Sequence, residues 1–126
     1  MAPGGINIVS CVWLLALLAT VGCNKSNSPP LPLSVEQLPA AMEKAFAKAK
    51  PELKDLAAQV VSSVQTNAYA KAYQELQGLS SVPDMTREQF SVIGRAMITV
   101  NLLLQSAAAK GDENAAEAVK VYRSQK

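Results

Sequence analysis

The spacing of the apolar residues is the feature that most constrains the fold of this chain. From Ser34 onward, apolar side chains recur every three or four residues, which is the spacing of one face of an α-helix. No stretch alternates apolar and polar residues as a half-buried strand does. The sequence therefore predicts an all-α protein of about five helices, in which short turns make consecutive helices antiparallel αα-hairpins.

Polar residues with capping geometry mark where these helices begin. Ser34 with Gln37, and Thr86 with Gln89, have the spacing of a capping box, in which each side chain bonds the backbone N–H of the other residue. Asp112 follows a glycine and is suited to cap the last helix. The predicted helices run over about residues 39–49, 51–65, 69–78, 87–110 and 113–124.

The apolar stripes predict which side chains face the core. In the first stripe Val35 precedes Leu38 and Met42, and in the longest segment Phe90 lies in register with Ile93. Further apolar residues widen the apolar face of that segment, which predicts that it is the central helix. These widening residues are Ile98, Leu102 and Leu103.

The first 22 residues read as a secretory signal peptide. No charged side chain occurs before Lys25, and residues 6–21 form an apolar stretch of sixteen. A bilayer-spanning helix needs about 20 apolar residues, so this stretch is short for a permanent anchor and suits the apolar region of a signal. The segment before it contains no Lys or Arg, so only the terminal amine supplies positive charge. A signal or anchor without lipid remains the alternative.

The stretch Thr20-Val21-Gly22-Cys23 ends the apolar run and resembles the lipobox of bacterial lipoprotein precursors. Val21, Gly22 and Cys23 fit that pattern, whereas Thr20 stands where the family usually has Leu. The resemblance implies that Cys23 receives a diacylglycerol thioether, becomes the mature N-terminus and is then often N-acylated with a fatty acid such as palmitate. Two or three acyl chains would hold a protein stably on a bilayer, where one holds it only marginally.

Residues 23–34 are predicted to be the lipid-anchor cysteine and a proline-rich tether. Pro29, Pro30 and Pro32 favour an extended conformation and exclude helix. Asn24 follows the cysteine, and the absence of Asp at this position favours the periplasmic face of the outer membrane under the enterobacterial sorting rule. Residues 35–126 would then be a helical domain displayed in the cell envelope.

Two segments within that domain resemble each other. NAYAKAYQEL and GDENAAEAVKVY are both similar to the turn and second helix of tetratricopeptide (TPR) hairpins, in which a small alanine lets two helices approach closely. The offset between them exceeds the 34-residue TPR period, and the first-helix pattern of that family is absent. A TPR-like pair of hairpins and a small helical bundle are therefore both open.

Composition argues against several classes of site. Histidine is absent, and the two cysteines, Cys11 and Cys23, both lie at the N-terminal end, so the helical domain has neither a Cys/His metal site nor the usual catalytic base. The net charge of +2 is too small to indicate nucleic-acid binding. We expect no cofactor, no metal, no nucleic-acid partner and no enzymatic activity.

The remaining polar and aromatic residues suggest an interaction surface. The tyrosines could line a groove between hairpins, Asn101 could hydrogen-bond across helices, and two lysines make the first helix basic. We therefore expect a non-enzymatic envelope lipoprotein that presents a helical module to a protein or peptide. The alternative is a structural, wall-associated lipoprotein, because the C-terminal VYRSQK faintly resembles the end of the peptidoglycan-linked murein lipoprotein. The candidate surface residues are Tyr69, Tyr73, Asn101, Tyr122, Lys44 and Lys48.

Overall fold

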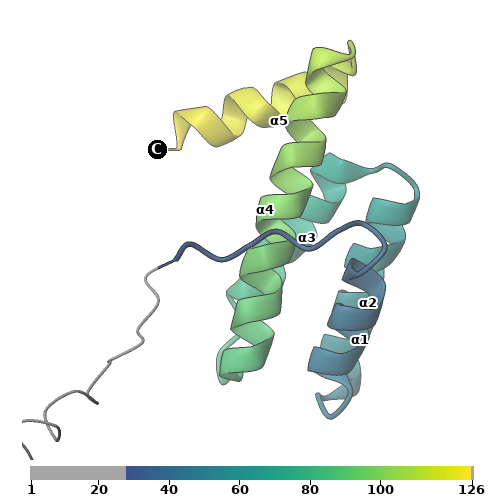
Figure 1. Ribbon diagram of the computed structural model, residues 1–126, viewed down its shortest axis with the longest axis vertical. Coiled ribbons are helices and arrows are strands. Elements are labelled where there is room, and N and C mark those ends of the chain that lie inside the picture. Colours follow the sequence, from purple (N-terminus) through teal and green to yellow (C-terminus); the bar gives the residue numbers. More distant parts are fainter. Residues whose placement is uncertain (1–27, 126) are drawn as a thin grey trace, which may run out of the picture.

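The computed structural model describes residues 28–125, which form five α-helices and no strand (Figure 1). This confirms the predicted all-α fold and the five predicted helices, although the first ends at Phe46 and not near residue 49. The signal segment 1–22 and Cys23 lie outside the described residues. The helices are α1 (Leu38–Phe46), α2 (Pro51–Gln65), α3 (Tyr69–Ser80), α4 (Arg87–Ala109) and α5 (Glu113–Ser124).

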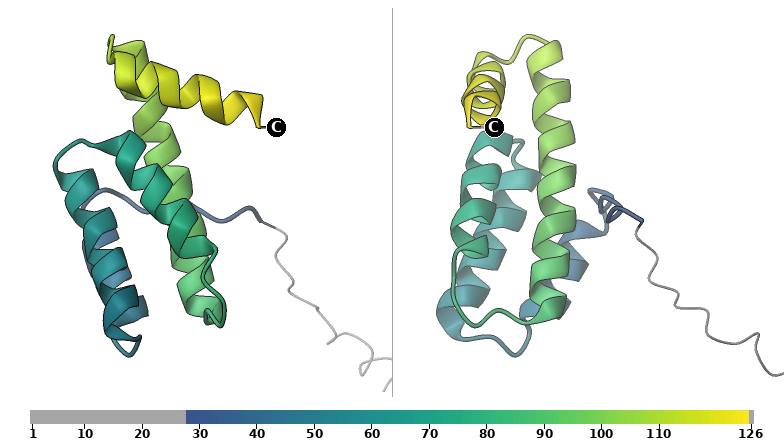
Figure 2. Two further views of the ribbon diagram at one scale, coloured as in Figure 1. Left: turned by 180° about the vertical axis from the view of Figure 1, so that it is seen from behind. Right: turned by 90° about the vertical axis from the view of Figure 1, so that its left-hand side faces the viewer.

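The helices form two layers. α1 and α4 lie side by side in one layer, and α2 and α3 lie in the other (Figure 2). Each helix contacts the next along the chain, and α1 also contacts α4, so the first four helices close into a ring. α5 crosses the end of α4 and touches the second layer at α3. The arrangement is a small helical bundle, one of the two that the sequence left open.

The core lies inside this ring, and all four of its helices contribute to it. Phe46 of α1, Val60 of α2, Leu76 of α3 and Val100 of α4 are almost completely buried. Burying such a side chain stabilises the fold by about 1.5–3 kcal/mol. α5 contributes little to this core, because Ala115 is its only fully buried residue.

The predicted caps of α4 and α5 are present, whereas α1 begins at Leu38 without a side-chain cap. Thr86 Oγ1 accepts a bond from the Gln89 N–H at 3.1 Å, and Gln89 Oε1 accepts one from the Thr86 N–H at 2.9 Å. Ser34 and Gln37 make the same reciprocal pair in the exposed turn before α1. Gln89 also makes a contact that the capping-box spacing does not predict. It is buried, and its Nε2 donates to the carbonyl oxygen of Ala45, which ties α4 to the last turn of α1.

Three apolar residues that the stripes placed inward are exposed instead. Val35 is 41% exposed, because α1 begins only at Leu38 and Val35 belongs to the preceding turn. Phe90 and Leu102 are 50% and 54% exposed, because α1, α3 and α5 cover only one side of α4. By length and composition alone, α4 could also cross a membrane, which no other helix in the described part of the chain could do.

The C-terminal end of the predicted tether is bound to the helical bundle. Leu33 is buried in the core, and its carbonyl oxygen accepts a bond of 2.6 Å from Thr99 Oγ1 of α4. Arg95 Nε donates to the carbonyl oxygen of Leu31 at 2.8 Å. Residues 31–33 therefore lie strapped across α4 (Figure 1), and the folded unit begins about four residues before the predicted boundary at 35.

Candidate interaction groove

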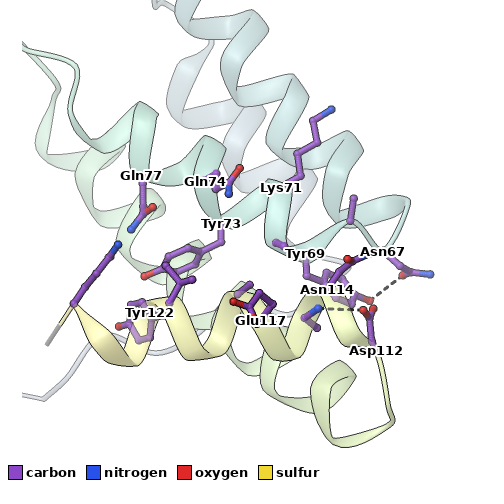
Figure 3. Close-up of a pocket in the computed structure, with 16 residues that line it drawn as sticks. Asn67, Tyr69, Lys71, Tyr73, Gln74, Gln77, Asp112, Asn114, Glu117 and Tyr122 are labelled. Atoms are coloured by element: carbon purple, nitrogen blue, oxygen red, sulfur yellow. Dashed lines mark hydrogen bonds between the residues drawn. The ribbon is translucent and has the colours of Figure 1, made fainter.

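A groove of about 610 Å³ opens between α3 and α5 (Figure 3). Tyr69 and Tyr73 of α3 form part of one wall, and Tyr122 of α5 forms part of the other. The structure thus brings the three candidate tyrosines to one place, between the two helices that resemble each other in sequence.

Local sequence explains where the tyrosines point. Tyr69 begins α3 and Tyr73 follows one turn later, so the two side chains share a face of the helix. The turn before α5 contains Gly111, whose positive φ of 96° glycine adopts without strain, and it redirects the chain across the bundle. Asp112 then caps α5 by accepting a bond from the Ala115 N–H at 3.1 Å.

Tyr73 and Tyr122 contact each other between the two walls of the groove. Their ring centroids are 5.3 Å apart and their planes make an angle of 83°, which is an edge-to-face contact. Burial, reinforced by the neighbouring Tyr122 hydroxyl, raises the pKa of Tyr73 to about 12. The Tyr73 phenol therefore stays protonated throughout the physiological range and can serve as a neutral hydrogen-bonding group.

The end of the groove nearest the turns is held by polar contacts. The Tyr69 hydroxyl donates to Asn67 Oδ1 at 2.8 Å (Figure 3). Asn67 has a φ of 60°, a left-handed conformation that asparagine tolerates better than most residues. This turn fixes Tyr69 near the start of the groove, close to the capped start of α5.

The rest of the lining is rich in amide groups. Gln74 and Gln77 of α3 and Asn114 of α5 present both donors and acceptors (Figure 3). Glu117 and the capping residue Asp112 add carboxylates. Lys71 adds one ammonium group, 3.8 Å from Glu75 Oε1 of the same helix. Aromatic faces flanked by amides can hold an extended peptide, because the rings bury apolar side chains while the amides bond its backbone.

The other three candidate residues do not join this groove. Asn101 is partly buried, and the cross-helix bond expected of it is absent: its Oδ1 accepts a bond from Gln105 Nε2 of the same helix at 3.3 Å. That expectation was wrong because Asn101 faces away from the centre of the buried face of α4. Lys44 is exposed on α1, which lies in the other layer, and Lys48 is exposed in the turn that follows α1.

Sequence reasoning missed the amide lining. The two segments that resemble TPR hairpins supply both walls of the groove. Their similarity was therefore the sequence signal that could have identified Gln74 and Asn114 as lining residues. Within residues 28–125 no three Cys, Asp or Glu side chains gather in a way that could hold a metal ion.

Comparison of the chain with family models, curated proteins and solved structures finds no match. The function must therefore be argued from the residues and their geometry.

Proposed function

We propose that this chain is a non-enzymatic cell-envelope lipoprotein whose helical bundle presents the groove between α3 and α5 to a protein or peptide partner. Acyl chains on Cys23 anchor it, at the periplasmic face of the outer membrane. The anchor rests on the lipobox-like sequence, and the binding role rests on the groove.

The observation that carries the proposal is the placement of the groove relative to the tether. The chain enters along α4, where Arg95 and Thr99 hold residues 31–33. The right-hand view of Figure 2 shows this extended segment on one side of α4, and α3 and α5 on the other. A module tethered from the first side would leave its groove open to the surrounding compartment.

The groove lining indicates the kind of partner. Its aromatic residues are tyrosines, which bury apolar area at a low cost in side-chain entropy. Gln74, Gln77 and Asn114 offer neutral hydrogen-bonding groups. The charged lining residues are Lys71, Asp112 and Glu117, of which Asp112 is the cap of α5. We therefore expect an extended peptide segment with one or more apolar or aromatic side chains and no strong charge.

Site-specific photo-crosslinking in intact cells tests the proposal. A photoreactive residue in place of Gln74 lies in the groove, whereas one in place of Gln59, exposed on α2, is the matched control. We expect a discrete adduct at position 74 and none at 59, and loss of the adduct when Tyr73→Ala is added.

Equal adducts at both positions, or an adduct that survives Tyr73→Ala, would contradict the groove as the binding site. Lys44→Ala should leave the adduct unchanged, because Lys44 lies in the other layer of the bundle. Absence of any adduct together with recovery of the protein bound to sacculi would favour a wall-associated structural role.

A further inference from the structure

The side of α4 that the other described helices leave uncovered, its outer face, carries large exposed apolar residues among uncharged polar ones. Phe90, Ile98 and Leu102 follow one row at intervals of eight and then four residues, and Phe90 and Leu102 are half-exposed. The polar residues on the same side are Ser91, Asn101 and Gln105, all uncharged. Between Gln89 and Ala109, Arg95 is the only charged residue. Only 33% of the most apolar stretch of α4 is buried in the fold. A helix face that merely met water would normally carry more charge.

The strapped tether extends this face. Leu31 is 74% exposed, although Arg95 holds its carbonyl oxygen against α4. The chain therefore reaches the bundle over the outer side of α4, where it crosses in front of the helix in Figure 1. Arg95 lies on α4 one turn before Thr99, beside the row that contains Ile98 and Leu102.

The length of chain before this point limits how far the face can be from an anchor at Cys23. Eight residues lead from Cys23 to Leu31, and they span at most about 28 Å when fully extended. The bonds from Arg95 and Thr99 join this short tether to the bundle on α4, so the α4 side is the side that the chain from Cys23 meets first.

We propose that the outer face of α4, together with Leu31, rests on the lipid surface to which Cys23 is anchored. This inference rests on the proposed function, since it takes the acylated Cys23 as the anchor. Phe90, Ile98 and Leu102 then enter the interfacial region, as the apolar face of a helix lying in the plane of a membrane does. Arg95, at the edge of that face, meets phosphate groups of the lipid. The groove between α3 and α5 points away from the membrane.

Spin labelling of the full chain in isolated bacterial membranes tests this orientation. If the signal is removed and Cys23 is alkylated, the mature wild-type protein offers no free thiol, so Leu102→Cys creates a single labelling site. Gln59→Cys, exposed on α2, is the matched control. We expect the nitroxide at 102 to lose accessibility to a water-soluble nickel chelate and to gain accessibility to oxygen. The nitroxide at 59 should remain accessible to the chelate.

Each other outcome has a distinct meaning. A label at 102 that is as accessible to the chelate as the label at 59, in protein that is membrane-bound, would overturn the orientation and leave the lipoprotein assignment intact. Dipolar broadening between labels at 102 would show that a second copy covers this face, which also overturns it. Labelling of the wild-type chain, or its absence from the membrane fraction, would contradict the proposed function, and the orientation would fall with it.

Discussion

Thr99 in the middle of α4 donates its hydroxyl hydrogen to the carbonyl oxygen of Leu33, 66 positions earlier, at 2.6 Å. Both residues are buried, and the contact fixes the side on which the chain enters the bundle. The proposed orientation of the protein depends on this bond and on the neighbouring bond from Arg95 to Leu31.

Thr99→Val should destabilise the fold and release the strap. The substitution keeps the side-chain shape but leaves the buried Leu33 carbonyl oxygen without its donor, which costs about 1–3 kcal/mol. Urea unfolding measures the loss, and faster proteolytic cleavage near residues 28–33 reports the released strap. Thr66→Val is the control, because Thr66 donates to Ser62 at an exposed helix end, and we expect a change within about 0.5 kcal/mol. Equal losses in the two variants would contradict the role of Thr99.

Tyr122→Ala should loosen α5 without unfolding the rest of the bundle. α5 has one fully buried residue, so its edge-to-face contact with Tyr73 is a large part of what holds its last turns in place. Such a pair contributes about 0.5–1.5 kcal/mol beyond its buried area. Hydrogen exchange should therefore accelerate at the amides of α5 and change little in α2. Val121→Ala, at an exposed neighbouring position, should leave both rates unchanged.

The stability of the protein should fall as the pH rises from about 10 to about 12. The pKa of Tyr73 is raised to about 12 in the folded chain, whereas an unperturbed tyrosine titrates near pH 10. The unfolded chain therefore loses this proton first, so the stabilising contribution is complete below about pH 10 and disappears as the pH passes the folded value. Urea midpoints across this range measure the fall, and Tyr73→Phe should reduce its slope. In folded protein the same variant should lose the phenolate absorbance that develops near pH 12.

Gln89→Ala should cost more stability than Gln37→Ala, although both residues hold the same place in a capping box. Gln89 is buried and bonds both the Thr86 N–H and the Ala45 carbonyl oxygen, so its removal leaves two backbone groups unpaired, at a cost of about 2–3 kcal/mol. Gln37 is exposed, and water can replace its bond of 3.3 Å to the Ser34 N–H. Thermal unfolding of the two variants compares the costs, and equal costs would mean that the bond to Ala45 contributes nothing.

The positions of the helices could be predicted from the sequence because their signals are local. Apolar spacing, the Thr86–Gln89 box and the Asp112 cap each act within a few residues, and all three appear in the structure. The three tyrosines could be grouped for a similar reason, since each lies on a recognisable helix face.

The features that the sequence did not predict depend on contacts between distant parts of the chain. The row from Phe90 to Leu102 has helical spacing whether or not a neighbour covers it, and only the arrangement of α1, α3 and α5 leaves it exposed. Likewise, nothing local to Leu33 marks its carbonyl oxygen as the partner of Thr99. Asn101 has the polarity expected of a cross-helix bond, yet the partner within its reach is Gln105, one turn later.

Metabolic labelling with an alkyne fatty acid tests the central claim, that the chain is a lipoprotein anchored through Cys23, most directly. The wild-type protein and Cys11→Ser, in which the altered residue lies in the proposed signal segment, should both incorporate the label. Cys23→Ser should incorporate none and should leave the membrane fraction. Equal labelling of the wild type and Cys23→Ser would contradict the anchor, and with it the proposed display of the groove from a membrane.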